Sequence, residues 1–213
     1  MTCFVLVRHG QTEWNRVERF RGRADIPLNA TGLEQARLTA ERIAARWTPT
    51  AIYASPLQRA RQTAEAIGAL TALAVQPHQG LLDIDFGQCQ GLTSAEARGR
   101  WPDVVDAWYG HPALARFPGG ERLADVRARG SAAIAELSLR HPGATVVLVG
   151  HTVANRAILL GILGLGDDAL WRLGQDPCAI NVFEAGERSY VLSCLNDTCH
   201  LDALRISPPA SRP

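Results

Sequence analysis

Two histidines far apart in the chain are each flanked by glycine, and each follows a short apolar run. The first lies in Arg8-His9-Gly10 after Phe4-Val5-Leu6-Val7, and the second lies in Gly150-His151-Thr152 after Thr145-Val146-Val147-Leu148-Val149. Short apolar runs rich in β-branched residues are typical of buried parallel strands. Open α/β sheets bind ligands at the carboxyl ends of their strands. If the two strands are neighbours, the two imidazoles face each other across one site.

Arginine supplies the charge of this predicted site. Arg8 precedes the first histidine, and Arg59 lies where the strand Ala51-Ile52-Tyr53-Ala54 passes into a helix, whose N-terminal amides add positive character. The cluster of Arg8, Arg59, His9 and His151 contains no carboxylate, and planar guanidinium groups suit a phosphate or a sulfate. A neutral imidazole can attack phosphorus in line and form a phosphohistidine, while the arginines disfavour its protonation and stabilise the transition state.

Departure of an alkoxide requires a proton donor, and the stretch from Leu81 to Gly87 offers two aspartic acids, Asp83 and Asp85. A dianionic substrate phosphate nearby would raise the pKa of such an acid and keep it protonated. The same pair could be read as a metal-binding Asp-x-Asp, and two histidines could bind zinc. Because arginines beside both histidines would repel a cation, we expect no metal and no cofactor.

The elements that must position these residues alternate between strand and helix, which predicts a three-layer α/β/α sandwich around a mainly parallel sheet. A helix is expected over about 31–47, with Asn29 or Thr31 as its N-cap. Another is expected to open at Ser55-Pro56, with Ser55 as N-cap and Pro56 at the first helical position. Further helices are predicted over about 121–140 and 154–163, and further strands at 72–76, 179–184 and 189–195.

Residues from about 80 to 120 differ in character, since glycine, proline and tryptophan punctuate short helical pieces. We expect this segment to be a small helical cap over the strand ends. The chain of 213 residues is long enough for one domain, expected over 1–205, with a loose tail at 206–213. Trp101, Trp108 and Trp171 are expected to pack in the cap and its rim.

Composition narrows the class of protein. The net charge is +1 and aromatic residues are few, so we expect neither nucleic acid nor a membrane as a partner. No apolar run approaches the length of a membrane span, and the N-terminus does not have the pattern of a signal peptide. The five scattered cysteines form no Cys-x-x-Cys, which favours reduced thiols in a cytoplasmic protein.

Four ordered segments resemble the signatures of the histidine phosphatase superfamily, the phosphoglycerate-mutase-like proteins. They are Val7-Arg8-His9-Gly10-Gln11-Thr12-Glu13-Trp14-Asn15, Ser55-Pro56-Leu57-Gln58-Arg59-Ala60-Arg61-Gln62-Thr63-Ala64, Leu82-Asp83-Ile84-Asp85-Phe86-Gly87-Gln88-Cys89-Gln90-Gly91-Leu92 and Val149-Gly150-His151-Thr152. The resemblance spans about Phe4 to Leu201. It implies the phosphoglycerate-mutase-like fold and phosphoryl transfer through a phosphohistidine.

The resemblance also implies a role for each matched residue. His9 is implied as the nucleophile, and Arg8, Arg59 and His151 are implied to hold the phosphoryl group. The acid falls on Asp83, where most relatives carry glutamate. Because aspartate is one methylene shorter, either the loop sits closer, or a water relays the proton, or Asp85 takes part.

Other candidates line the substrate side of the implied pocket. Asn15, Arg21 and Gly22 are implied there, and Thr152 belongs to the second-histidine motif. His200 either reaches the substrate or caps a loop. For Arg19 and Arg21 the sequence leaves two alternatives open, a place in the pocket or a place on the surface.

The resemblance leaves three functions open. Mutases that depend on 2,3-bisphosphoglycerate carry a longer insertion with a basic pair and a proline run, whereas Trp108-Tyr109-Gly110-His111-Pro112 stands in that region here. We therefore predict hydrolysis of a small phosphorylated metabolite, with such a mutase as the alternative. A third alternative is a catalytically weak phosphate-binding or regulatory protein, which the aspartate at position 83 keeps open. A homodimer is compatible with the family.

The end of the chain refines the predicted branch. The stretch from Leu195 to Leu201 resembles the broad-specificity, α-ribazole-phosphate and metal-independent phosphoserine phosphatases. Phosphoserine-hydrolysing members tend to have a histidine near Phe86, and the lack of one here weakens that assignment. The physiological substrate is therefore not named by the sequence.

Overall fold

The computed structural model describes residues 1–186 and 189–204, so the tail predicted at 206–213 lies outside the described residues. The described residues form one six-stranded sheet in the order β3-β2-β4-β1-β5-β6. The strands are β1 (Thr2–Arg8), β2 (Ala51–Ala54), β3 (Val75–Pro77), β4 (Thr145–Gly150), β5 (Ile180–Ala185) and β6 (Tyr190–Asp197). Strands β3, β2, β4 and β1 pair in parallel, and β5 pairs antiparallel with both of its neighbours, β1 and β6.

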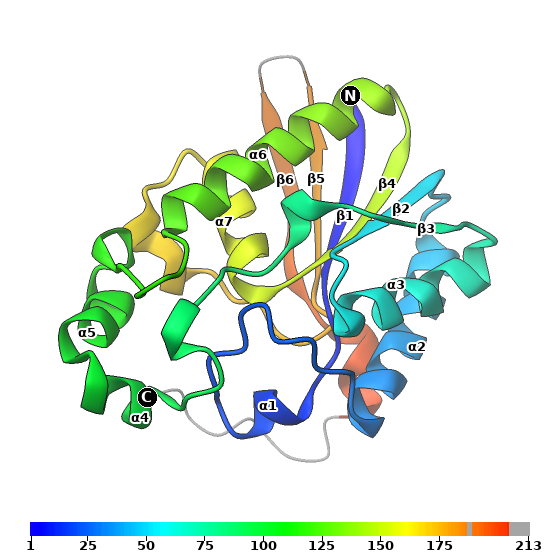
Figure 1. Ribbon diagram of the computed structural model, residues 1–213. Helices are drawn as coiled ribbons and strands as arrows, with labels where there is room; N and C mark the ends of the chain where they lie inside the picture. The colour runs from blue at the N-terminus through cyan, green and yellow to red at the C-terminus, as the bar shows by residue number, and fades with distance from the viewer. Residues whose placement is uncertain (187–188, 205–213) are drawn as a thin grey trace.

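Helices cover both faces of this sheet, so the predicted α/β/α sandwich is confirmed (Figure 1). Alternate residues of β1 explain the layers, because successive side chains of a strand point to opposite faces. Phe4 and Leu6 belong to the core shared with α6 (Leu123–Arg140) and α7 (Thr152–Ile162). Val5 and Val7 belong to the core shared with α2 (Ala30–Arg46) and α3 (Gln58–Thr71). Burial on both faces accounts for the unbroken apolar run.

The segment between β3 and α6, residues 78–122, is called the cap here. It contains three single-turn 3₁₀ helices, η1 (Gln79–Leu81), η2 (Gly87–Cys89) and η3 (Pro112–Leu114), and two α-helices, α4 (Ser94–Arg100) and α5 (Pro102–Gly110). Figure 1 shows α4 and α5 in green to one side of the sheet, near the short helix α1 (Glu13–Arg16). Two more 3₁₀ helices are η4 (Asp167–Arg172) and η5 (Cys199–Leu204). Among the described residues, every helix is too short or too polar to cross a bilayer.

Two predicted element boundaries are wrong for physical reasons. The helix after β2 does not begin at Ser55, because the Ser55 amide continues the sheet by donating to the Val149 carbonyl, and α3 begins at Gln58. Its first amide donates instead to the Asp25 carboxylate at 2.6 Å, a cap that comes from a distant loop. The predicted strand at 72–76 is shorter, because Ala72 takes a left-handed conformation with φ of 55° and ends α3. In α2 the N-cap is Asn29, whose side chain accepts from Gly32.

Candidate active site

Strand register brings the two histidines together. Strands β1 and β4 pair in parallel with Arg8 opposite Gly150, so His9 and His151 both follow directly after the last paired position. The His9 amide extends the ladder by donating to the Gly150 carbonyl at 3.0 Å. Both rings are fully buried, and their centroids lie 5.1 Å apart. The expectation that the two strands are neighbours is thereby confirmed.

Hydrogen bonds give the two imidazoles opposite tautomers. His9 Nδ1 lies 2.6 Å from the carbonyl oxygen of Gly10, which can only accept, so Nδ1 carries the proton and Nε2 keeps a free lone pair. His151 Nδ1 accepts from Arg59 Nε at 3.2 Å, which leaves the proton on His151 Nε2. Both Nε2 atoms are buried without a protein partner among the described residues. The site therefore holds one nitrogen that can attack and one N–H that can donate.

Burial and charge keep both rings neutral. The pKa of His9 is lowered well below its ordinary value by desolvation first, and then by Arg59, Arg8 and Arg21. Desolvation also lowers the pKa of His151, with Arg59 as the next cause. Arginines alone therefore do not explain why the imidazoles stay unprotonated, since removal from water has the larger effect.

Asp83 reaches into the same cluster, so the expectation that the cluster lacks a carboxylate is wrong. Its Oδ2 lies 3.5 Å from Arg59 Nη2 and 3.9 Å from His151 Nδ1, and its Oδ1 accepts from the Ile84 amide. Burial raises the pKa of Asp83, while Arg59 and Arg21 oppose that rise. The carboxyl group is therefore biased towards its protonated form even before a phosphate binds.

Arg59 is fixed entirely by its neighbours. It lies in the first turn of α3, is fully buried, and donates to the carbonyl oxygens of Ala24 at 2.7 Å and Gly22 at 2.8 Å. Gly22 has φ of +49°, and a Cβ there would lie 2.9 Å from the Ile84 carbonyl oxygen, so a side chain does not fit. Gly22 thus contacts the site by holding Arg59 with its carbonyl oxygen rather than by lining the cleft.

Arg8 lines the cleft from the end of β1. Its Nη1 donates to the Gln175 carbonyl oxygen, and its Nε is buried without a protein partner among the described residues. Gln175 is held in turn by its side chain, which donates to Asn181 Oδ1 at 2.7 Å, and Asn181 donates to the Leu6 carbonyl in β1 at 3.0 Å. Burial lowers the pKa of Arg8 to about 9, followed by repulsion from Arg21 and Arg156. An anion bound here would relieve that repulsion.

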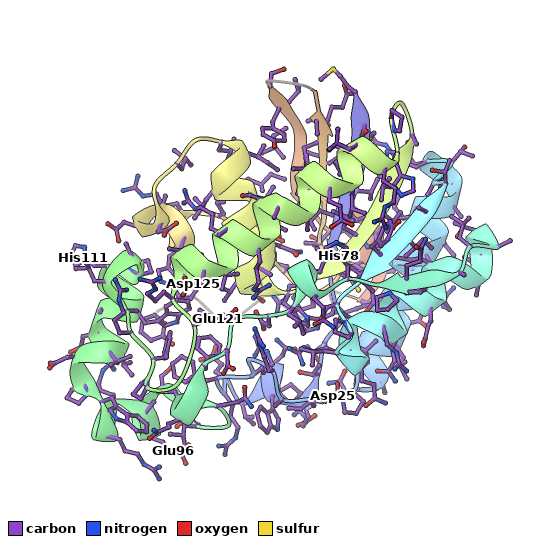
Figure 2. The ribbon with its side chains drawn as sticks, turned by 45° about the horizontal axis from the view of Figure 1, so that its top comes forward. Asp25, His78, Glu96, His111, Glu121 and Asp125 are labelled. Carbon is purple, nitrogen blue, oxygen red and sulfur yellow. The ribbon has the colours of Figure 1, made fainter. Side chains whose placement is uncertain are left out.

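A clamp that sequence reasoning missed holds the acid-bearing loop. Arg129, in α6, donates to the carbonyl oxygens of Gly80, Leu82 and Asp83 at 3.1, 2.6 and 3.0 Å. Glu121 pairs with Arg129 at 3.1 Å and accepts from the Asp85 amide at 3.0 Å. Glu121 is labelled in Figure 2 and belongs to the cap, two residues before α6 begins. No motif in the sequence marked Arg129 or Glu121, because the groups that they hold in the loop are backbone carbonyls and an amide.

Asp85, the second candidate acid, is occupied elsewhere. Its Oδ1 accepts from the Gly87 amide at 2.8 Å, and its Oδ2 lies 4.0 Å from Arg23 Nε. Asp85 is not among the cleft-lining residues, whereas Asp83 is. The structure thus places Asp83, and not Asp85, beside the histidines.

A cleft of about 1040 Å³ adjoins this cluster: Arg8 and Asp83 line it, whereas the fully buried His9, His151 and Arg59 are not among its lining residues. Asn15, Arg21 and Thr152 line it as the resemblance implies, and Arg19, which was left between pocket and surface, lines it as well. Asn15 Oδ1 accepts from the Thr12 amide and hydroxyl, so its amide nitrogen remains as a donor. Thr152 begins α7, whose first-turn amides suit an anion, and its hydroxyl is buried without a protein partner among the described residues.

His200 lies elsewhere. Its Nε2 contacts the Thr39 hydroxyl in α2 at 2.9 Å, and it is not among the cleft-lining residues. Of the two alternatives given for His200, the structure therefore favours the structural contact.

The outer part of the cleft contains residues that the sequence did not single out as a site. Trp171, expected only to pack, lines the cleft together with Tyr109 and Phe86. Phe20 lines the cleft as well. The other lining residues are polar, charged or small and come from several loops and helices: Gln11, Glu18, Ser94, Arg98, Val153, Arg156, Gln175, Asp176 and Pro177. Aromatic residues scattered over the sequence give no periodic signal, so their gathering in one wall could not be foreseen.

A doubly covered α/β sheet with two buried neutral imidazoles beside clustered arginines defines a phosphoryl-transfer enzyme that uses histidine. The chain belongs to the histidine phosphatase superfamily (branch 1), whose family model matches residues 4–198. It is 36% identical over 201 residues to phosphoserine phosphatase 1 of Hydrogenobacter thermophilus, covering 94% of this chain and 95% of that protein.

Two solved structures share the fold over nearly the whole chain. Bacillus stearothermophilus YhfR matches with a TM-score of 0.90 and 28% identity, covering 95% of this chain and 100% of that one. A mycobacterial glucosyl-3-phosphoglycerate phosphatase in complex with VO3 matches with a TM-score of 0.84 and 30% identity, covering 92% and 99%. The predicted family and the phosphatase class are thereby confirmed.

Proposed function

We propose that this chain hydrolyses small phosphomonoesters without a metal, through a phosphohistidine formed on His9. The observation that carries the proposal is the pair of opposite tautomers, a free lone pair on His9 Nε2 and a proton on His151 Nε2, at rings 5.1 Å apart. The names of the relatives, phosphatases of phosphoserine and of glucosyl-3-phosphoglycerate, support the same class of reaction.

The first half of the reaction forms the phosphoenzyme. Arg8, Arg59, the His151 Nε2 proton and the first amides of α7 hold the phosphoryl oxygens and stabilise the charge on them. His9 Nε2 attacks phosphorus as the P–O bond to the leaving alcohol breaks. Asp83 gives its proton to the departing oxygen, so an alcohol leaves and a carboxylate remains.

The second half returns the enzyme to its starting state. Water attacks the phosphorus of phospho-His9 while the Asp83 carboxylate accepts a proton from that water. The N–P bond breaks, inorganic phosphate leaves, and Asp83 is protonated again. Each proton and phosphoryl group is thus accounted for by groups already in the site, and no step calls for a cation.

The test is hydrolysis of p-nitrophenyl phosphate in the presence of a chelator, by the wild type and by His9→Ala. We expect turnover in the wild type and a loss of about a thousandfold or more in the variant. His111→Ala is the matched control, because His111 is an exposed residue of the cap, whereas His9 is fully buried (Figure 2). Acid-labile, base-stable labelling of the wild type by a ³²P-labelled substrate, absent in His9→Ala, identifies the intermediate. Unchanged turnover in His9→Ala would refute the assignment.

The two alternatives make different predictions in the same assays. A phosphoglycerate mutase would interconvert 3-phosphoglycerate and 2-phosphoglycerate only when 2,3-bisphosphoglycerate is present. A phosphate-binding regulator would bind inorganic phosphate and turn over none of these esters. Hydrolysis that needs no bisphosphoglycerate supports the phosphatase.

A further inference from the structure

Six aromatic rings form one continuous cluster from beside the acid-bearing loop to the outer cap. Their neighbouring centroids lie between 4.8 and 5.8 Å apart, and the members are Phe20, Phe86, Phe117, Trp108, Trp171 and Tyr109. The chain has only 13 aromatic residues by its counts of Trp, Tyr and Phe (5, 3 and 5), so almost half of them gather here. Four of the six belong to the buried core, so the two rings that core packing leaves unexplained are Tyr109 and Trp171.

The cluster changes from core to surface as it runs outward along the cleft. Phe86, three residues after Asp83, is 6% exposed and lines the cleft near the acid. Tyr109 and Trp171 also line the cleft, yet they remain 47% and 37% exposed. Large aromatic side chains left accessible inside a cleft gain free energy when a ligand covers them, and such exposed patches mark binding sites.

Tyr109 and Trp171 are held in place before any ligand arrives. Their rings stack with centroids 5.6 Å apart and planes 26° from parallel. Trp171 Nε1 donates to the Trp108 carbonyl oxygen at 2.7 Å, and the Tyr109 hydroxyl lies 2.6 Å from the Ser94 hydroxyl. The Arg156 guanidinium lies 4.9 Å from the Trp171 ring centroid. A surface fixed in this way loses little conformational entropy when it binds a flat group.

The size of the cleft points in the same direction. Its volume of about 1040 Å³ slightly exceeds the range of roughly 300–1,000 Å³ found for pockets that hold drug-sized ligands. A phosphoryl group and a three-carbon alcohol would leave most of that volume and the aromatic pair uncovered. A larger leaving group that ends in a ring would cover both.

We propose that Tyr109 and Trp171 form a ring-binding subsite and that the preferred substrates are nucleoside monophosphates, phosphomonoesters whose alcohol carries a flat heteroaromatic ring. With the phosphoryl group at His9, the leaving group passes Asp83 and Phe86, and the ring packs against the Tyr109–Trp171 pair. This inference rests on the proposed function for the hydrolysis step. Aromatic side chains stack on every nucleobase, so the subsite selects for a ring more than for a particular base.

The decisive comparison is between adenosine 5′-monophosphate and ribose 5-phosphate. Both release a primary alcohol from the same ester linkage, so they differ in the base and not in the difficulty of the chemistry. We expect kcat/KM to be about tenfold or more higher for adenosine 5′-monophosphate, with uridine 5′-monophosphate close to it. Phosphoserine, which has no ring, should behave like ribose 5-phosphate.

Variants at position 109 locate the effect. Tyr109→Leu should lower the ratio of the two kcat/KM values to about one, whereas Tyr109→Phe, which keeps the ring and loses only the Ser94 contact, should preserve it. Leu114→Ala is the matched control, because Leu114 is an exposed apolar residue of the cap that does not line the cleft. Turnover of ribose 5-phosphate in each variant reports that the site is folded.

The outcomes separate this inference from the proposed function. Equal kcat/KM values for the nucleotide and the sugar phosphate, or an equal loss of both in Tyr109→Leu, would refute the ring-binding subsite while hydrolysis stands. If no ester is hydrolysed at all, calorimetry of His9→Ala still tests the subsite, since the nucleotide should bind about tenfold more tightly than ribose 5-phosphate. Equal affinities there would also overturn it.

Discussion

Arg129 Nη2 donates a hydrogen bond to the backbone carbonyl oxygen of Asp83 across 3.0 Å, from a helix that contributes no residue to the cleft lining. The same guanidinium holds Leu82 and is held by Glu121, so the backbone of the proposed acid is fixed from outside the site. The side chain of Asp83 faces Arg59 on its other side. Asp83 is therefore positioned from two directions, and only Arg59 belongs to the proposed phosphate site.

Arg129→Lys should move the acid without removing it, because a lysine cannot reproduce a forked guanidinium that donates to three carbonyls. We expect kcat for alkyl phosphates such as glycerol 3-phosphate to fall by about tenfold, with a smaller change for p-nitrophenyl phosphate, whose leaving group needs no proton. Arg127→Lys is the control, since Arg127 lies on the same helix and pairs with Asp167 away from the cleft. An equal loss for both esters would indicate a purely structural role for Arg129.

Asp83→Asn removes the proton donor and keeps the shape. Loss of general acid catalysis costs about 10²–10⁴-fold, and we expect a loss in this range for alkyl phosphates but a loss below about tenfold for p-nitrophenyl phosphate. The fall in kcat with rising pH that reports deprotonation of the acid should also disappear in the variant. If both esters lose the same factor, another group is the donor.

The buried Asp83 carboxyl should also affect stability. Burial raises the pKa of Asp83 in the folded protein above the ordinary value of 3.8. Its favourable contribution to the free energy of unfolding is therefore present below pH 3.8 and is lost as pH rises through the folded pKa. Asp83→Asn has no charge to lose. The Tm of Asp83→Asn minus the Tm of the wild type should therefore increase from pH 4 to pH 8. Thermal unfolding measures this difference, with Asp103→Asn as a matched surface control. A difference that decreases over that range would contradict the raised pKa.

The two buried histidines have the opposite effect on acid stability. Their folded pKa values lie well below the ordinary 6.5, so the unfolded chain binds protons that the folded chain does not as pH falls below about 6.5. Each histidine should reduce stability by up to about 1.4 kcal/mol per pH unit there. His9→Asn, which can still donate to Gly10, should show a shallower decline between pH 6.5 and 5 in denaturant titrations, and an unchanged slope would count against neutral burial of His9.

Chelation should leave activity unchanged. Among residues 1–186 and 189–204 there is no group of three or more histidine, cysteine, aspartate or glutamate side chains placed to hold a metal ion. Arginine side chains near both histidines would repel a cation. We expect equal rates before and after dialysis against EDTA, with a transition-metal salt added back as the comparison. A rate restored only by one metal would overturn the metal-independent mechanism.

The sequence was most informative where chemistry depends on strand ends. His9 and His151 were predicted to meet because each follows a short apolar run, and the parallel register of β1 and β4 meets that expectation. The choice of Asp83 as the acid was only implied by the resemblance, and its position beside Arg59 was not predicted, since the cluster was expected to contain no carboxylate. The contacts that could not be predicted involve backbone atoms far away in the sequence. Asp25, in another loop, accepts a hydrogen bond from the first amide of α3. Arg129 donates to carbonyl oxygens, which every residue type has.

The pairing of Tyr109 with Trp171 could not be predicted from the sequence for a related reason. Tyr109 lies in the cap and Trp171 in η4, 62 positions later in the chain. The residues around each of them form no motif that indicates a binding site. Only packing of the cap against η4 brings them to one side of the cleft, as the bond from Trp171 to the Trp108 carbonyl records. Long-range packing of this kind leaves no periodic trace.

The contiguity of the cap has a practical consequence for protein engineering. Residues 78–122 form one uninterrupted insert between β3 and α6, while His9, His151, Arg8 and Arg59 lie outside this insert. A chimaera could carry the α4 and α5 helices of another protein and keep the Asp83 loop with its Arg129 contacts. We expect it to hydrolyse phosphomonoesters by the same steps but to accept esters of different alcohols.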